Sequence, residues 1–352
     1  MAYTDIDDPS AYFQTTLYSG TGSEQSITNT GNSDLQPDWV WLKVRSNGTY
    51  GHALFDSVRG VNKVIGSNTT NAEEDQSSNP SLSAFNSDGF TVGGYYNNVN
   101  QSGQTFVSWQ WKAGTSFTND ASATGIGDID SSGSVNTDAG FSVITATSDG
   151  AANKDIAHGL GAVPDVIFAK NLERGYNWDC YFKTLGYNAS LQLNTTAAVR
   201  TGAWGSNTFT TTTFETLEDY SSKSGEKYVY YCFAEKQGYS KFGSYTGNGS
   251  TDGPFSFCSF RPAFVMIKQA TDASTPWFIF DTKRNPGNKA DLKINPNSIN
   301  AESAANEIDI LSNGFKLRTS GSYNNGSGKT MIFMAFAENP FVTSTGVPAT
   351  AR

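Results

Sequence analysis

Three short runs in the chain share one pattern of apolar and polar positions. Each begins with a proline, continues through β-formers and aromatics, and ends with a lysine six residues after the proline. Proline has no N–H to give to a β-ladder, so it begins a strand but does not sit within a central one. The runs are too apolar for strands with one wet face. They predict strands buried on both faces or in a sandwich core, with the lysine where the strand emerges. They are Pro37 to Lys43 (PDWVWLK), Pro164 to Lys170 (PDVIFAK) and Pro262 to Lys268 (PAFVMIK).

The sequence around these runs also repeats, which separates an internal repeat from a chance match. Each run is followed by a short strand pattern that ends near an asparagine, and each copy closes on a second apolar run: TFVSWQWK, YVYYCFAE or MIFMAFAE. The last two share Phe-Ala-Glu, so the first copy is the most divergent. We expect an all-β chain of three tandem antiparallel β-sandwich repeats with very little helix.

The repeat also predicts where the parts of the 352-residue chain begin and end. Residues 115–139 are nearly all small or acidic and predict a linker. The first residues are polar and acidic, and we interpret them as an arm that docks on a neighbouring subunit, with a flexible tail as the alternative. The expected parts are an N-terminal arm at 1–12, sandwich repeats at 13–114, 140–237 and 238–340, an acidic Gly/Ser linker at 115–139, and a C-terminal tail at 341–352.

Composition supports this fold class and narrows the function. Aromatics make up 13% of the chain, charged residues only 16%, and there are 35 glycines, which is typical of a β protein with many turns. A net charge of −9 argues against nucleic-acid binding, because that role needs a basic face. No run approaches the roughly 18 apolar residues of a membrane helix, and the N-terminus lacks a signal-peptide pattern. We therefore expect synthesis in the cytoplasm and no membrane insertion.

The chain offers little for catalysis. Its two histidines, His52 and His158, lie in different copies, and neither is near a GxSxG motif or a cluster of metal ligands. The 33 acidic residues leave a glycosidase pair open, but copies that keep core strands and vary their polar loops are typical of scaffolds. The three separated cysteines predict small buried thiols, with a disulfide as the alternative. We expect a protein that is not an enzyme.

Charged residues follow the second strand in two of the copies. Asp56 with Arg59 and Asp281 with Arg284 occupy corresponding places, whereas the middle copy lacks both charges. We interpret these as local ion pairs or solvated side chains, with contacts in a ligand groove as the alternative.

Aromatics in Gly/Asn/Ser-rich loops are the strongest functional signal. An aromatic ring stacks on the C–H face of a sugar, and neighbouring amides and carboxylates bind its hydroxyls. The alternative is that these rings pack under their own loops or against another subunit. The candidate ligand-binding residues are Tyr95, Tyr96, Trp204, Trp277 and Tyr323.

One acidic stretch has the oxygen spacing of the first half of a calcium loop. Asp128, Asp130 and Ser132 are followed by glycine, but the twelfth position is alanine in place of the closing glutamate, and no flanking helix is predicted. An ordinary acidic turn is the alternative, and we expect no other cofactor.

Two stretches resemble a known family. Residues 141–170 contain F-x-V-x-T followed by HGLG-x-x-P-D-x-I-x-x-K, and residues 54–73 read LFDSVRGVNKVIGSNTTNAE. Both are similar to repeat-containing, tail-fibre-like virion proteins of tailed bacteriophages, especially marine ones. The resemblance implies lectin-like, concanavalin-type sandwich repeats of the jelly-roll kind, and it transfers no catalytic or binding residue.

The resemblance and the aromatics together predict a virion structural protein. A tail fibre or appendage that contacts host-surface glycans is the leading hypothesis, a capsid-decoration or connector protein the second, and a polysaccharide depolymerase the third. The expected partners are other virion proteins, host glycans and copies of the same chain, with a trimer as one option.

Overall fold

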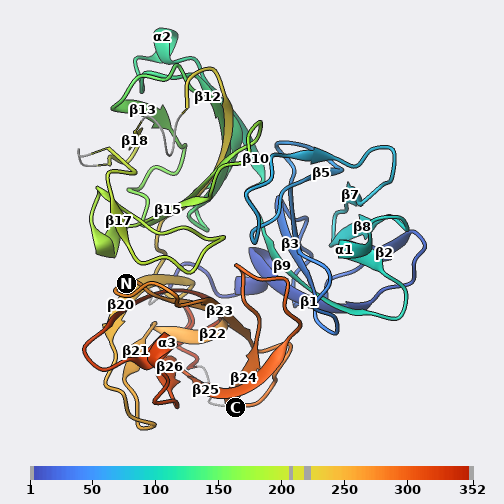
Figure 1. Ribbon diagram of the computed structural model, residues 1–352, viewed down its shortest axis with the longest axis vertical. Coiled ribbons are helices and arrows are strands. Elements are labelled where there is room, and N and C mark those ends of the chain that lie inside the picture. The colour runs from blue at the N-terminus through green and yellow to red at the C-terminus, as the bar shows by residue number, and fades with distance from the viewer. Residues whose placement is uncertain (1–3, 206–208, 218–222, 349–352) are drawn as a thin grey trace.

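The computed structural model describes residues 4–205, 209–217 and 223–348. The described chain is an all-β protein of antiparallel sheets with a few short helical turns, as its strand patterns predicted. In Figure 1, the blue, green and orange parts of the chain form three lobes around a common centre. Within the described residues, no helix has the length and apolar character to cross a membrane.

Each lobe contains one large antiparallel sheet, and the same strand order recurs in all three. We call the three parts of the chain the first segment (13–111), the second segment (115–233) and the third segment (240–340). The orders are β1 (Phe13–Ser19), β9 (Thr105–Trp111), β3 (Trp39–Val44), β4 (His52–Asp56); β12 (Phe141–Thr147), β19 (Lys227–Phe233), β14 (Val166–Asn171), β15 (Asp179–Phe182); and β20 (Ser240–Thr246), β27 (Thr330–Pro340), β22 (Phe260–Gln269), β23 (Trp277–Asp281).

A smaller sheet shares a core with each large sheet. In the first segment, Val40 and Leu42 of β3 lie in one cluster with Phe90 and Val92 of the smaller sheet. The smaller sheets are β2 (Gln25–Ile27), β8 (Phe90–Val92), β7 (Leu82–Phe85); β13 (Lys154–Ala157), β18 (Thr213–Thr216); and β21 (Phe255–Phe257), β26 (Gly314–Leu317), β25 (Ser303–Leu311), β24 (Lys289–Lys293). Short elements complete the chain: β5 (Lys63–Val64), β6 (Glu74–Asp75), β16 (Ala189–Ser190), β17 (Arg200–Thr201), α1 (Asn97–Asn100), α3 (Ser322–Asn325), η1 (Pro9–Ala11) and η2 (Lys183–Leu185).

The strands with the repeated apolar pattern are buried on both faces, as predicted. Successive side chains of a strand point to opposite faces. Val40 and Leu42 therefore enter the core of the first segment, while Trp39 and Trp41 point into a second, central core. The strands β14 and β22 divide their side chains in the same way.

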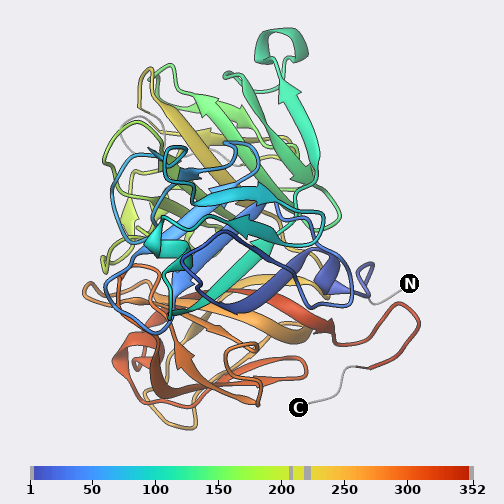
Figure 2. The same cartoon turned by 90° about the vertical axis from the view of Figure 1, so that its right-hand side faces the viewer.

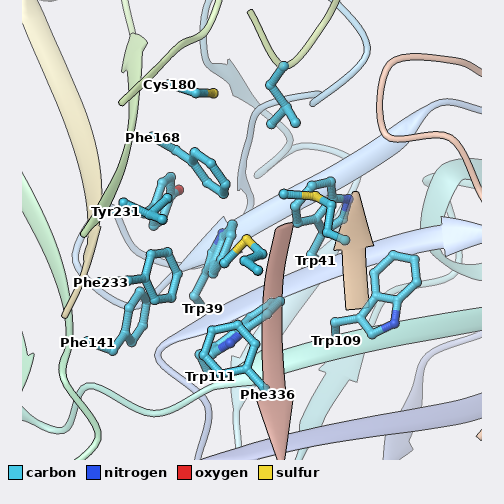
Figure 3. Close-up of a cluster of buried hydrophobic side chains, with 14 of the residues drawn as sticks. Trp39, Trp41, Trp109, Trp111, Phe141, Phe168, Cys180, Tyr231, Phe233 and Phe336 are labelled. Atoms are coloured by element: carbon cyan, nitrogen blue, oxygen red, sulfur yellow. The ribbon is translucent and has the colours of Figure 1, made fainter. Parts of the chain in front are cut away.

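All three segments contribute to this central core. Figure 3 shows aromatic rings from different segments side by side in it. Trp39 stacks on Tyr231 of the second segment with ring centroids 4.4 Å apart, and Trp111 meets Phe336 of the third segment at 5.6 Å. Because such rings bury large apolar areas, this core joins the three lobes into one body.

Hydrogen bonds at corresponding positions also link each pair of segments. One set runs between backbones: Glu73 N to Leu172 O at 2.9 Å, Val199 N to Ala270 O at 2.8 Å and Glu302 N to Arg45 O at 2.8 Å. The other set runs from a ring nitrogen at the start of the second strand to a carbonyl of another segment: Trp178 to Gly66 O at 2.9 Å, Trp277 to Gln192 O at 3.0 Å and His52 to Asn295 O at 3.0 Å. Each set closes a ring of three segments.

The three lysines do not emerge into solvent, so that prediction was wrong. Lys43, Lys170 and Lys268 are fully buried. Each ammonium donates to the carbonyl oxygen of the last residue of its own strand and to an oxygen of the loop that follows; for Lys43 these are Val44 O at 2.8 Å and Tyr50 O at 3.0 Å. Burial lowers the pKa of all three lysines to about 8. The lysine therefore ties the strand to the loop that follows it.

Residues 115–139 are not a linker. They form β10 (Thr115–Asn119), the short helix α2 (Ala121–Thr124) and β11 (Ser131–Asn136), and the two strands extend the large sheet of the second segment beside β12. Asp120 caps α2 through the amide of Ala123, and Gly125 ends it at φ 67°. This hairpin stands out at the top of Figure 2. Its small residues misled the prediction because β-strands tolerate Ser and Thr when one face is solvated.

The N-terminal arm packs on its own chain. Ile6 belongs to the central core, Thr4 Oγ1 donates to Gln237 O at 3.0 Å, and Asp8 accepts from Ser10 and Ser33. The start of the predicted tail also has contacts, since Ser344 bonds Asp7. Cys180, Cys232 and Cys258 are free and buried, which confirms that interpretation over a disulfide.

Candidate functional site

Two of the five candidate aromatics are buried and are not available to a ligand. Trp204 is 1% exposed within the core of the second segment, and Trp277 is 0% exposed in the central core, where its ring N–H bonds Gln192 O. Their glycine- and serine-rich neighbours suggested surface loops. In the structure, however, both side chains pack in the protein core. Assigning Trp204 and Trp277 to the ligand was wrong.

The other three candidates reach the surface in corresponding loops of the first and third segments. Tyr95 is 76% and Tyr323 is 50% exposed, while Tyr96 is half-buried. Tyr96 is the N-cap of α1, and Gly321 is the N-cap of α3. The third segment therefore has no ring at the position of Tyr96.

The chain holds α1 in place through a buried asparagine. Asn100 Nδ2 donates to Ser23 O at 2.6 Å and to Gly93 O at 3.0 Å, and its Oδ1 accepts from Thr21 N at 2.9 Å. Asn325 bonds the corresponding loop of the third segment in the same way. A buried side chain that satisfies backbone groups fixes the loop, so Tyr96 is presented on a rigid support.

Tyr96 lines a pocket of about 250 Å³ at the loop end of the first segment. Its side chain also packs against the core of that segment. Val64, Ala72 and Ile299 supply further apolar surface. The polar lining consists of Thr49, Asn68, Thr69, Asn71, Glu74 and Asn98, and Gly51, His52 and Gly66 also line the pocket.

Two separate side-chain hydrogen bonds lie among the residues that line the pocket. Asn98 Nδ2 donates to Tyr96 Oη at 3.2 Å, and Asn71 Nδ2 lies 3.4 Å from Glu74 Oε1. Burial and the Glu74 carboxylate raise the pKa of Tyr96 to about 12, so its hydroxyl stays protonated at neutral pH. Amide, hydroxyl and carboxylate groups thus offer both donors and acceptors.

The charge of the pocket is negative. Among the described residues that line it, Glu74 is the one formally charged side chain. His52 accepts from Trp41 Nε1 at 2.8 Å through Nδ1 and contacts Asn295 O through Nε2. Burial, and secondly the charge of Lys43, hold its pKa well below 6.5, so the ring is neutral. The pocket therefore disfavours an anionic ligand.

The three residues of the calcium pattern each bond a different partner. Asp128 accepts from Asp155 N at 2.9 Å, Asp130 accepts from Ala121 N at 2.9 Å, and Ser132 lies in β11 with its hydroxyl 3.5 Å from that of Thr145. Over the part of the chain that the structure describes, no cluster of three His, Cys, Asp or Glu side chains has metal-binding geometry. This favours the acidic-turn alternative.

The Asp–Arg pairs lie inside the molecule. Asp56 and Arg59 are paired and nearly inaccessible, as are Asp281 and Arg284. Each pair meets an aromatic of another segment: Tyr231 donates to Asp56 at 2.7 Å, and Trp109 donates to Asp281 at 3.0 Å. The interpretation as local ion pairs was correct. The other two interpretations, solvated side chains and contacts in a ligand groove, were wrong, because the pairs are buried.

Comparison with known proteins gives one match. A family model described as a domain of unknown function (DUF7483) matches residues 8–340. No curated protein and no solved structure matches the chain.

Proposed function

The chain belongs to the DUF7483 family, and we propose that it is a non-enzymatic virion protein of a tailed bacteriophage that contacts host-surface glycans through the Tyr96 pocket. The virion assignment rests on the sequence resemblance at residues 54–73 and 141–170. The binding assignment rests on the pocket, where the Tyr96 side chain, three apolar side chains and several amides line a space of about 250 Å³.

The chemistry of the pocket favours a neutral sugar. A pyranose has an apolar C–H face for the Tyr96 ring and hydroxyls that donate to Glu74 and exchange hydrogen bonds with Asn71 and Asn98. The Glu74 carboxylate disfavours uronic and sialic acids, because two negative charges in a partly desolvated site repel. We also infer that the three segments are tandem lectin-like jelly-roll repeats, and that copies of the chain assemble on the virion, as a trimer in one form.

A titration with neutral monosaccharides, followed by ligand-observed NMR, tests the binding assignment. We expect saturable binding by the wild type and a loss of at least about tenfold in affinity for Tyr96→Ala, since stacking on one aromatic contributes about 1–1.5 kcal/mol and the hydroxyl bonds add to it. Tyr323→Ala is the matched control, because Tyr323 lies in the corresponding loop but outside the pocket. Equal binding by the wild type and Tyr96→Ala would contradict the assignment.

A structural role in the virion is the second candidate, and one observation favours it. Phe255 and Phe257 of the edge strand β21 are 43% and 53% exposed, whereas Ser26 and Thr28 occupy the corresponding places in the first segment. The fold does not need aromatics there, so these rings suit a contact with another virion subunit. A connector would fail to bind sugars in the titration and would be needed for particle assembly.

A further inference from the structure

A cleft lies where the first and third segments meet, beside β1 and β27. It encloses about 280 Å³. Phe13, Ala263 and Ala337 give it an apolar floor, while Gln14, Thr15, Thr282, Lys283, Glu338 and Asn339 are among its polar lining. The cleft is separate from the Tyr96 pocket, with which it shares no lining residue.

The cleft exists because two positions have small side chains here and larger ones at the other junctions. Thr15 lies opposite Trp109 in the large sheet; Val143 and Phe242 hold the same place opposite Tyr231 and Met334. Val143 and Phe242 are both members of the central core.

The second small residue is Ala263. It lies at a β-bulge within β22, and Asp38 and Asp165 hold the corresponding place directly before β3 and β14. Each aspartate accepts a hydrogen bond from a backbone amide just after the last large-sheet strand of its own segment. The junction between the second and third segments is closed further, because Glu235 accepts from Phe242 N and Lys241. The small side chains of Thr15 and Ala263 therefore leave the junction between the first and third segments open at these two positions.

The open junction contains a buried polar group without a partner. Thr15 is 4% exposed, and its hydroxyl has no hydrogen-bond partner among the described residues. The neighbouring Gln14 does not serve it, since its amide is committed to Ser10 O, Ser33 O and Gly31 N. An unpartnered buried hydroxyl costs about 1–3 kcal/mol. The oxygen itself has almost no accessible surface, so a ligand that bonds it must turn the Thr15 side chain about its Cα–Cβ bond toward the cleft.

The mouth of the cleft carries a positive charge. Lys283 is exposed, and the one hydrogen bond described for its ammonium is a long contact of 3.5 Å to Thr30 Oγ1. The carboxylate of Glu338, which also lines the cleft, is paired with Arg261 at 3.3 Å. Lys283 is thus the charge that remains for a ligand.

We propose that this cleft is a second binding site, for a small organic anion with an apolar body. The body lies on Phe13, Ala263 and Ala337, a polar group of the ligand bonds the Thr15 hydroxyl, and the negative charge faces Lys283. A phenolic carboxylate has all three features, so 4-hydroxybenzoate is the probe of choice.

Equilibrium titrations by NMR test the site with 4-hydroxybenzoate, benzoate and the uncharged 4-hydroxybenzyl alcohol. Thr15→Phe, which copies the third segment, should abolish binding by filling the cleft. Thr15→Val, which copies the second segment, should weaken 4-hydroxybenzoate but not benzoate. Lys283→Gln should weaken both anions about tenfold and leave the alcohol unchanged. Lys183→Gln, at another junction, is the matched control and should change nothing.

The outcomes separate clearly. Saturable binding with this pattern of losses supports the site. Absence of saturable binding by the folded wild type, or binding that Thr15→Val, Thr15→Phe and Lys283→Gln all leave intact, overturns it. Thr15→Val is nearly isosteric, so it tests the proposal even if Thr15→Phe fails to fold. Sugar binding at Tyr96 is independent of each result.

Discussion

The junction between the third and first segments is built around a buried ion pair, whereas the junction between the second and third segments is apolar at the same positions. In the first case Asp281 and Arg284 meet Trp109, with the guanidinium 5.7 Å from the ring centroid. In the second, Phe182, Leu185 and Met334 take the corresponding places and lie in or against the central core.

The backbone contacts at these two junctions are nevertheless the same. Val199 N bonds Ala270 O and Glu302 N bonds Arg45 O, both at 2.8 Å. The two junctions therefore keep the same main-chain hydrogen bond, while the side chains between the segments vary. A buried ion pair contributes little to stability, but breaking it is strongly destabilising, because removal of one partner leaves the other charge buried and unpaired.

Breaking the ion pair should have the largest effect. Asp281→Ala leaves the Arg284 guanidinium, 0% exposed, without its main partner, and should lower the free energy of unfolding by about 3–5 kcal/mol. Urea denaturation measures this. Asp252→Ala removes a carboxylate from an exposed pair with Lys316 and should leave the free energy of unfolding almost unchanged. Similar losses for the two variants would contradict the account.

Acid should weaken the molecule next. His52 stands at the junction of the first and third segments where the other two junctions have Trp178 and Trp277. Its folded pKa is well below 6.5, and burial also lowers the pKa of His158 to about 4. Below pH 6.5 the unfolded chain binds protons at both histidines and the folded chain does not. Stability is therefore present above pH 6.5 and falls as the pH drops.

The size of the acid effect is set by the pKa shifts. His158 alone should remove up to about 3 kcal/mol by pH 4. The free energy of unfolding, measured at several pH values, should fall less steeply with decreasing pH for His158→Gln and His52→Gln than for the wild type. If both variants lose stability with falling pH as steeply as the wild type, the loss of stability in acid comes from other titratable groups.

Converting one junction into another should have the smallest effect. Asp56→Phe, Arg59→Leu and Tyr231→Met together copy Phe182, Leu185 and Met334 into the junction of the first and second segments. Replacement of a complete buried ion pair by apolar residues is often neutral, so the triple variant should stay within about 1 kcal/mol of the wild type. A loss as large as that of Asp281→Ala would mean that the ion pair itself determines the junction.

Local pattern was enough to predict the strands but not what they pack against. The three proline-to-lysine runs predicted β3, β14 and β22 with both faces buried. One face of each of these strands belongs to a core shared by all three segments. The local pattern did not predict this, because it depends on contacts between residues distant in sequence. For the same reason Lys43 was predicted to be exposed, although loop carbonyls solvate its ammonium inside the protein.

The candidate site was predicted in part. Loop aromatics beside asparagines led to Tyr96, but the same rule selected Trp277, whose indole N–H bonds another segment. One signal separated them: Trp277 directly precedes the apolar strand residues Phe278 to Phe280, while Tyr96 precedes Asn97 and Asn98. Glu74, Asn71 and Ile299 come together with Tyr96 only through the fold.

We propose that the Tyr96 pocket binds a host glycan. Binding of the purified, fluorescently labelled protein to host cells, with and without periodate treatment of the cell surface, tests this proposal. We expect saturable binding that periodate removes, that Tyr96→Ala loses and that Tyr323→Ala keeps. Absence of binding by folded protein, or binding that survives both periodate and Tyr96→Ala, would contradict it.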